Sequence, residues 1–171
     1  MYPILETREI AGNVFLQRIH APRIARKRKA GQFLVLRLGE NGERIPLTIV
    51  ASDPAEGSVS VIFQAVGRST AGFSRLSAGD AYTDVVGPPG RPTHIERFGT
   101  VVGIGGGIGA APLLPIASAV KEAGNRLVTI MGARTKDLLI LEDEMAAASD
   151  ELVVTTDDGS RGRKGFVTDA L

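Results

Sequence analysis

Val-Val-Gly-Ile-Gly-Gly-Gly-Ile-Gly-Ala-Ala-Pro, at residues 101–112, is the stretch that decides the fold of this chain. An apolar β-branched run passes into glycines at 105, 106, 107 and 109. Glycine lets a backbone turn sharply and approach a pyrophosphate, and a following helix offers N–H groups and a positive dipole end. Gly105-x-Gly107-x-x-Ala110 also fits the dinucleotide fingerprint G-x-G-x-x-G/A. The stretch predicts a buried strand, a phosphate loop and a helix; a glycine-rich turn at an ordinary corner is the alternative.

Residues 99–171 continue as an alternation of strands and helices. The pattern predicts a parallel α/β domain, because strands joined through helices run in the same direction. The expected elements are strand Thr100–Ile104, helix Ala110–Ala123, strand Arg126–Met131, helix Leu141–Ser149 and strand Glu151–Thr155.

Two polar segments follow strands of this domain, at the sheet edge where open α/β sheets bind ligands. Arg134 follows Arg126–Met131, where an acid that would hold a ribose 2′-hydroxyl is missing. A cation there suits a 2′-phosphate better than a bare ribose. Asp157-Asp158-Gly159 follows Glu151–Thr155. Adjacent acids before glycine predict a turn rather than a metal site, and we expect no metal.

Residues 1–98 consist of short β-rich runs separated by turn residues. They predict a six-stranded antiparallel Greek-key barrel. The expected strands are Ile4–Ile10, Val14–Ile19, Gln32–Leu38, Ile45–Ala51, Ser58–Val66 and Ala81–Val86. The charge run Arg26-Lys27-Arg28-Lys29 lies between strands without an interleaved aromatic residue. This run predicts a solvated loop, with a binding patch as the alternative.

Two stretches of this half carry side chains suited to binding. In a strand, Arg44, Pro46 and Thr48 share one face, so a guanidinium could pair with a phosphate while Thr48 hydrogen-bonds a ring nitrogen. A barrel strand with a surface arginine is the alternative. Gly67-Arg68-Ser69-Thr70 opens a short helix, expected to run to about Ser77, with hydroxyls at its start. That arrangement fits an anion site or a plain helix cap.

Composition excludes several classes of function. Twenty basic and nineteen acidic residues leave a net charge of +1, so no bulk field favours nucleic acid or an anionic membrane. The chain has no cysteine and thus holds no disulfide or iron–sulfur cluster of its own. No apolar run approaches the roughly 20 residues of a membrane span, and the N-terminus lacks a signal pattern. We therefore expect a cytoplasmic protein.

The order of these motifs resembles the ferredoxin-reductase-type flavoprotein family over the whole chain. It is most similar there to electron-transfer subunits of the dihydroorotate dehydrogenase and NADH-dependent reduced ferredoxin:NADP oxidoreductase types. The resemblance rests on Ala30-Gly31-Gln32-Phe33, Arg44–Thr48, Gly67–Thr70, Gly87-Pro88-Pro89-Gly90 and the glycine loop, in that order. It implies an FAD-binding barrel at 1–98 and an NAD(P)-binding α/β domain at 99–171, with hydride passing between nicotinamide and the flavin N5.

The resemblance also implies which residues hold the cofactors. Thr48 would lie near N5 and Leu47 against the isoalloxazine, but the family's arginine falls one place early, at Arg44, and its stacking tyrosine is replaced. No side-chain acid or base is expected to be catalytic. The implied flavin-binding residues are Arg44, Ile45, Pro46, Leu47, Thr48, Ile62, Phe63, Gln64, Gly67, Ser69 and Thr70. The implied nicotinamide-nucleotide-binding residues are Gly105, Gly106, Gly107, Ile108, Gly109, Ala110, Ala111, Pro112, Arg134, Asp157, Asp158 and Gly159.

The implied function is an NAD(P)H-dependent, FAD-containing oxidoreductase that serves as an electron-transfer module for a larger flavoprotein or iron–sulfur subunit. NAD(H) and NADP(H) both stay open as the nucleotide. The alternatives are a non-enzymatic nucleotide-binding or regulatory module and a stand-alone flavin reductase that needs no partner.

The last residues predict that a part is missing. Gly165–Leu171 reads as a loop entering another helix, and domains of this type need more strands to cover both faces of the sheet. The resembled subunits continue with further strands and a cysteine-rich segment that carries a [2Fe-2S] cluster. We expect the chain to be an N-terminal part of a longer protein, able to exchange hydride with FAD but not to complete electron transfer. A naturally short relative is the alternative.

Overall fold

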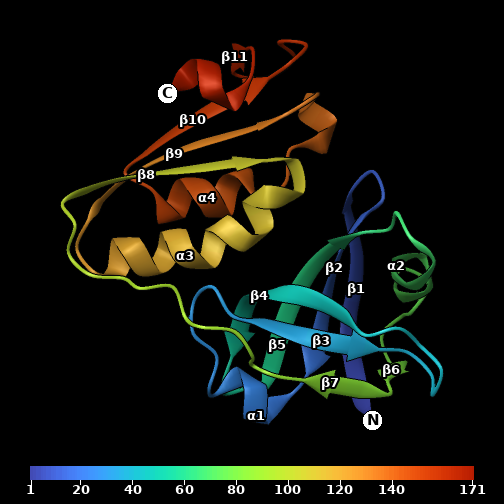
Figure 1. Ribbon diagram of the computed structural model, residues 1–171. Helices are drawn as coiled ribbons and strands as arrows, with labels where there is room; N and C mark the ends of the chain where they lie inside the picture. Colours follow the sequence, from blue (N-terminus) through green and yellow to red (C-terminus); the bar gives the residue numbers. More distant parts are fainter. The chain divides into compact units, whose positions relative to one another are not determined.

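The computed structural model describes all 171 residues, which form two compact units, Met1–Thr93 and His94–Leu171 (Figure 1). The first unit is a single antiparallel sheet. Its strands are β1 (Tyr2–Ala11), β2 (Val14–His20), β3 (Phe33–Arg37), β4 (Ile45–Asp53), β5 (Ser58–Gln64), β6 (Ala81–Tyr82) and β7 (Asp84–Val86).

The two ends of this sheet are formed by consecutive segments of the chain. The spatial order is β6-β1-β2-β5-β4-β3-β7, and only Thr83 separates β6 from β7. Tyr82 pairs with Tyr2 at one end, whereas Val86 pairs with Val35 at the other. The sheet is therefore almost closed on itself, which confirms the predicted barrel. The expected single strand Ala81–Val86 is divided, because its two halves pair with opposite ends of the sheet.

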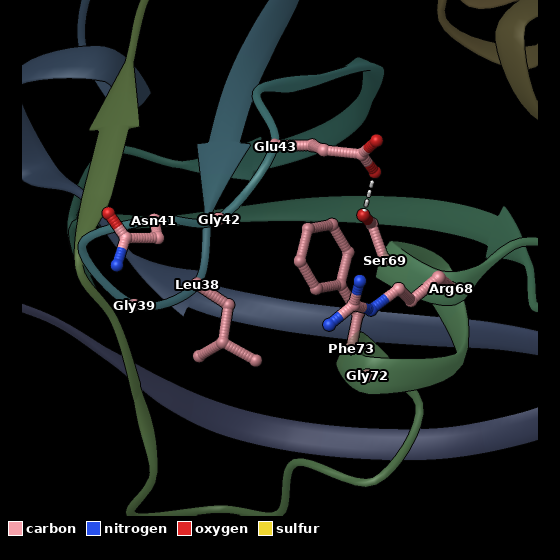
Figure 2. Close-up of a pocket in the computed structure, with 9 residues that line it drawn as sticks. All are labelled: Leu38, Gly39, Asn41, Gly42, Glu43, Arg68, Ser69, Gly72 and Phe73. Atoms are coloured by element: carbon pink, nitrogen blue, oxygen red, sulfur yellow. Dashed lines mark hydrogen bonds between the residues drawn. The ribbon is translucent and has the colours of Figure 1, made fainter.

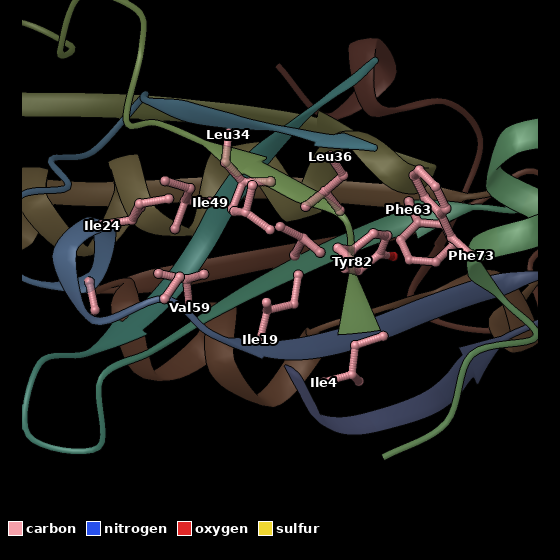
Figure 3. Close-up of a cluster of buried hydrophobic side chains, with 14 residues drawn as sticks. Ile4, Ile19, Ile24, Leu34, Leu36, Ile49, Val59, Phe63, Phe73 and Tyr82 are labelled. Atoms are coloured by element: carbon pink, nitrogen blue, oxygen red, sulfur yellow. The ribbon is translucent and has the colours of Figure 1, made fainter. Parts of the chain in front are cut away.

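The barrel core follows from the two-residue period of its strands. In β3, Leu34 and Leu36 are fully buried and belong to the central apolar cluster, while the alternate residues Phe33, Val35 and Arg37 are only half-buried. Figure 3 shows this cluster inside the sheet, with Tyr82 among the aliphatic side chains. The Tyr82 hydroxyl donates a 2.5 Å hydrogen bond to Gln17 Oε1, and burial raises the pKa of Tyr82. Gln17 Nε2 in turn donates to Phe73 O at 2.9 Å, so the polar atoms in this core are paired.

Two short helices accompany the barrel. Helix α1 (Pro22–Ala25) begins with proline in its first turn, where the missing N–H is tolerated. Its last turn passes into the charge run that we expected as a solvated loop. Helix α2 (Arg68–Phe73) is shorter than predicted, and Phe73 anchors it in the core.

The second unit is a parallel sheet with the order β11-β10-β9-β8, as predicted for an α/β domain. Helices α3 and α4 contact one another and pack on one face of the sheet, while the turn η3 lies on the other face (Figure 1). The elements are β8 (Thr100–Gly106), η1 (Gly107–Gly109), α3 (Ala110–Glu122), β9 (Arg126–Ala133), η2 (Lys136–Leu138), α4 (Glu142–Ala148), β10 (Glu151–Thr156), β11 (Arg163–Lys164) and η3 (Val167–Ala170).

The boundaries of the main elements lie close to the predicted ones. Helix α3 ends where Gly124 takes a left-handed conformation with φ of 81°, as a glycine after a helix commonly does. Strand β11 and the 3-10 turns η1 and η2 were not predicted. No helix of the structure combines the length and the apolar character needed to cross a membrane.

Candidate functional site

The glycine loop of the second unit presents bare backbone. Strand β8 ends at Gly106, which pairs with Gly132 of β9, and the chain then turns through η1 into α3. A Cβ at Gly106, Gly107 or Gly109 would meet no atom within 4 Å. Gly105 differs, because a Cβ there would lie 3.1 Å from Leu113 Cδ2. The first glycine therefore serves packing, whereas the later ones leave open space beside the backbone.

The start of α3 adds electrostatic character to this loop. Gly107 has φ of 53°, a left-handed conformation that favours glycine. Helix α3 is thirteen residues long, and no side chain caps its first turn. The N-terminal N–H groups of a helix lack intrahelical partners and carry the positive end of its dipole. The loop and the helix together can accept a phosphate group in the open space.

The segments that follow β9 and β10 lie side by side, because β9 and β10 are neighbours in the sheet. Asp157 N donates to Ala133 O at 3.1 Å and Asp158 N donates to Arg134 O at 3.3 Å. The parallel register places the ends of β8, β9 and β10 at one edge of the sheet. The predicted nucleotide residues of this unit are thus brought to one edge.

The acids after β10 form the predicted turn. Asp158 Oδ1 accepts hydrogen bonds from the Ser160 hydroxyl at 2.7 Å and from Ser160 N at 2.9 Å. These bonds hold the pKa of Asp158 below its usual range. Because Asp158 is bound within its own turn, Asp157 is the carboxylate of the pair left for a ligand.

Arg134 supplies an unpaired cation at the same edge. Its side chain is exposed and forms no ion pair, whereas the nearby Arg161 is held by Glu142 at 2.6 Å. Ser160 Oγ accepts a hydrogen bond from Lys136 N at 2.8 Å, which ties the segment after β9 to the turn after β10. Sequence reasoning did not name this link, although the hydroxyl after Asp157-Asp158-Gly159 was a possible signal.

In the first unit, the residues from Arg44 to Thr48 lie along the start of β4. Thr48 pairs with Phe33 and Pro46 with Val35 of the neighbouring strand β3. Pro46 and Arg44 are exposed and Thr48 is half-buried. Arg44 directly precedes β4 and has no ion-pair partner. The strand therefore offers a hydroxyl, a rigid apolar ring and a cation in close succession.

The hydroxyls at the start of α2 are already engaged within the chain. Thr70 Oγ1 accepts a hydrogen bond from Gly67 N at 3.1 Å, as in a plain helix cap. Ser69 Oγ donates to the Glu43 carboxylate across a pocket of about 410 Å³. Figure 2 shows these two side chains pointing toward one another, Glu43 from the loop before β4 and Ser69 from α2. Sequence reasoning missed Glu43, since nothing local signals a contact with Ser69.

The predicted flavin-binding residues Ile62, Phe63 and Gln64 lie in β5. The Phe63 side chain is 2% exposed and packs edge-on against Phe73 in the barrel core. A ligand contact at Phe63 would thus come from its backbone. Ile62 is also buried but lies outside the core cluster, and Gln64 is exposed at the end of the strand.

Comparisons with known proteins agree on one family, although no family model matches the chain. The chain is 50% identical to the dihydroorotate dehydrogenase B (NAD(+)) electron transfer subunit homolog of Thermotoga maritima, over 98% of this chain and 59% of that protein. It is 41% identical to the corresponding electron transfer subunit of Streptococcus pneumoniae, over 82% of this chain and 56% of that protein. The chain thus spans less than two thirds of these relatives.

Comparison with solved structures also finds similar oxidoreductases. A chain of the NADH-dependent reduced ferredoxin-NADP oxidoreductase, a system of flavin-based electron bifurcation, matches with a TM-score of 0.95 and 46% identity, over 99% of this chain and 61% of that chain. Phthalate dioxygenase reductase shares the fold at a TM-score of 0.75 and 20% identity, over 92% of this chain and 51% of that chain.

The chain therefore shares the ferredoxin-reductase-type fold that its motifs indicated. It is a homologue of the electron transfer subunits of dihydroorotate dehydrogenase B (NAD(+)) and of the matching chain of the NADH-dependent reduced ferredoxin-NADP oxidoreductase.

Proposed function

We propose that this chain is a flavin- and nicotinamide-nucleotide-binding module of an oxidoreductase, in which the barrel holds FAD and the α/β unit holds NAD(P)(H). The observation that carries the proposal is the similarity, over 99% of the chain, to the NADH-dependent reduced ferredoxin-NADP oxidoreductase. Homology at 46% identity makes the same cofactors the first expectation for this chain.

The nucleotide site is the edge formed by the glycine loop, Arg134 and Asp157. The open space beside Gly107 and the uncapped start of α3 fit a pyrophosphate. Asp157 would accept hydrogen bonds from a ribose hydroxyl or an amide, and Arg134 would face a phosphate. The choice between NADH and NADPH then depends on which of these two opposite charges meets the 2′-position. We propose NADH because the curated relatives are named for NAD(+), whereas the name of the solved relative contains both NADH and NADP.

The flavin site is the outer side of β4 together with the start of α2. Thr48 would hydrogen-bond the flavin near N5, and Arg44 would pair with a phosphate. Ser69 would bind the pyrophosphate once it leaves Glu43, while Thr70 keeps its helix cap. FAD, when bound, supplies hydride transfer at N5, and the protein supplies position and electrostatics. No side chain needs to act as an acid or a base in this proposal.

Electrons would pass from the flavin to groups that lie outside this chain. We propose that a [2Fe-2S] centre and a larger flavoprotein or iron–sulfur subunit take them onward, since this chain has no cysteine to hold a cluster. The relatives' name, electron transfer subunit, supports such a partner. The proposal also assigns the protein to the cytoplasm, where nicotinamide nucleotides are the common hydride carriers.

An anaerobic titration tests the proposal. The purified chain, saturated with FAD and desalted, should be yellow, and NADH or NADPH should bleach its visible flavin band. Thr48→Val should retain FAD but slow the bleaching, because it removes the hydroxyl near N5 and keeps the volume. Thr93→Val serves as the matched control at an exposed position outside the site. Protein that stays colourless with added FAD would contradict the proposal.

A second candidate is a nucleotide-binding module that has lost flavin. The observation favouring it is that both hydroxyls expected to bind the FAD pyrophosphate have partners within the chain, Glu43 and Gly67. Calorimetry separates the candidates, because this module would bind NADH or NADPH but not FAD. A stand-alone flavin reductase would instead reduce free flavin without any partner subunit.

A further inference from the structure

The charges of the barrel unit are distributed very unevenly along the chain. No acidic residue occurs between Glu9 and Glu40, yet this segment carries a series of cations. Two of them are paired, Arg18 with Glu56 and Arg37 with Asp84. The others are Arg23, Arg26, Lys27, Arg28 and Lys29. With a chain net charge of only +1, this cluster is a local concentration of positive charge.

Four of these cations form an exposed basic rim, which we define as Arg23, Arg26, Lys27 and Lys29. All four side chains are exposed and none forms an ion pair. Arg28 is different, because it is half-buried and its Nε donates to Ser52 Oγ at 2.9 Å. The basic rim is therefore free to meet charges from outside the chain.

The acids of the turn that contacts α1 are engaged elsewhere. Helix α1 packs against the turn between β4 and β5, since Ala21 N donates to Gly57 O at 2.8 Å. In that turn, Asp53 Oδ1 accepts from Glu56 N at 3.0 Å, and the Glu56 carboxylate binds Arg18 at 3.1 Å. Neutralisation of the rim must come from another molecule.

The basic rim borders a cavity with apolar walls. A pocket of about 530 Å³ lies between α1 and the end of β7, and Arg23 and Lys27 line it. Tyr2, Ile24, Val85 and Val86 also line it. Val86 is 57% exposed. Carbon surface and unpaired cations therefore lie together.

The apolar surface continues toward the proposed flavin strand. Val86 is paired with Val35, and Val35 with Pro46 of β4. Directly paired residues of adjacent strands share a face, so these three side chains form an apolar row across the outside of the barrel. Pro46 lies two residues before Thr48 on the same strand face. The row thus joins the cavity to the residues expected to hold the flavin.

We infer that the basic rim and the apolar row form a docking surface for a protein partner that presents acidic side chains around an apolar one. Charged rims around an apolar centre are the usual composition of transient protein interfaces, and the charges mainly speed association. Arg26 and Lys29 do not line the cavity, so the rim extends beyond it, which suits a broad acidic surface better than one small anion. We take this partner to be an electron-transfer protein, and in that respect the inference rests on the proposed function.

Binding of short fluorescent peptides tests the surface without flavin. One probe carries glutamates on both sides of a central Leu-Phe pair, and the other carries glutamates alone. The first peptide should bind more tightly, and added salt should weaken both. Arg23→Glu combined with Lys27→Glu should raise the dissociation constant of both peptides by about tenfold or more. Val86→Ser should weaken only the Leu-Phe peptide, by about threefold.

The matched control is Arg75→Glu, at an exposed arginine of the same unit that forms no ion pair and does not line the cavity. Equal weakening by Arg75→Glu would show binding to bulk charge and overturn the inference. If inorganic phosphate weakens peptide binding more than another salt does at the same ionic strength, the rim is a small-anion site, and this result would also overturn the inference. Because no cofactor takes part, failure of flavin binding leaves this result unaffected, and failure of peptide binding leaves the flavin test unaffected.

Discussion

Replacing Gly107 by alanine separates the structural role of the glycine loop from its role in binding. Gly107 has φ of 53°, and a Cβ there would meet no atom within 4 Å. Gly124 offers a matched control in the same unit, because its φ is 81° and its surroundings are equally open. Both variants place an L-residue in the left-handed region, so each should lower the free energy of unfolding by about 1–2 kcal/mol.

The two variants should differ in nucleotide affinity. The methyl group at 107 projects into the space where the backbone would approach a pyrophosphate, whereas the one at 124 lies at the far end of α3. We expect Gly107→Ala to raise the dissociation constant of NADH or NADPH by about tenfold or more, which corresponds to about 1.4 kcal/mol. Gly124→Ala should leave it within about twofold, because native protein still predominates after a loss of this size.

Isothermal calorimetry measures the affinities, and urea unfolding followed by circular dichroism measures the stabilities. Unchanged affinity in Gly107→Ala would refute the assignment of the loop as the pyrophosphate site. An equal loss of affinity in Gly124→Ala would show that lowered stability, and not the lost space, is responsible.

Three further predictions concern the barrel core, the α/β unit and the cofactor. Tyr82→Phe leaves Gln17 Oε1 without its buried donor and should cost about 1–3 kcal/mol in urea unfolding, and the double variant with Gln17→Leu should lose less than the sum of the two single losses. Hydrogen bonds from Lys121 and Leu127 N lower the pKa of Asp150, so their stabilisation is present above the unfolded value of about 3.9 and is lost as the pH falls through the lower folded pKa. Asp150→Asn should flatten this acid dependence of the urea midpoint, and an unchanged profile would contradict it. Arg134→Ala should weaken NADPH by about tenfold and leave NADH unchanged if a 2′-phosphate meets this cation, while equal effects on both nucleotides would exclude that role.

Local patterns in the sequence were sufficient for most of the fold. The run from Thr100 into Gly107 indicates a strand, a loop and a helix. Side-chain size and backbone freedom determine these elements, and both are local properties of neighbouring residues. Gly124 marks the end of α3 for the same reason. The turn at Asp158 was equally predictable, because its hydrogen bonds reach only two residues along the chain.

Features that depend on distant partners were not predictable. The strand expected at Ala81–Val86 divides at Thr83 because its halves pair with β1 and β3, far away in the chain. The hydroxyl of Ser69 meets Glu43 only once the barrel has formed. The two-residue alternation of Val59, Val61 and Phe63 indicates one buried face, and all three side chains are buried. The ligand contact that family resemblance gave Phe63 stays a prediction.

The division of the last barrel segment at Thr83 has a consequence for synthesis on the ribosome. Tyr82 must pair with Tyr2, and Val86 with Val35, before both ends of the sheet are covered. These pairings join residues far apart in sequence, and such contacts are slow to form. The growing chain therefore exposes two unpaired strand edges until residue 86 has emerged, and in that interval it is most open to pairing with another chain.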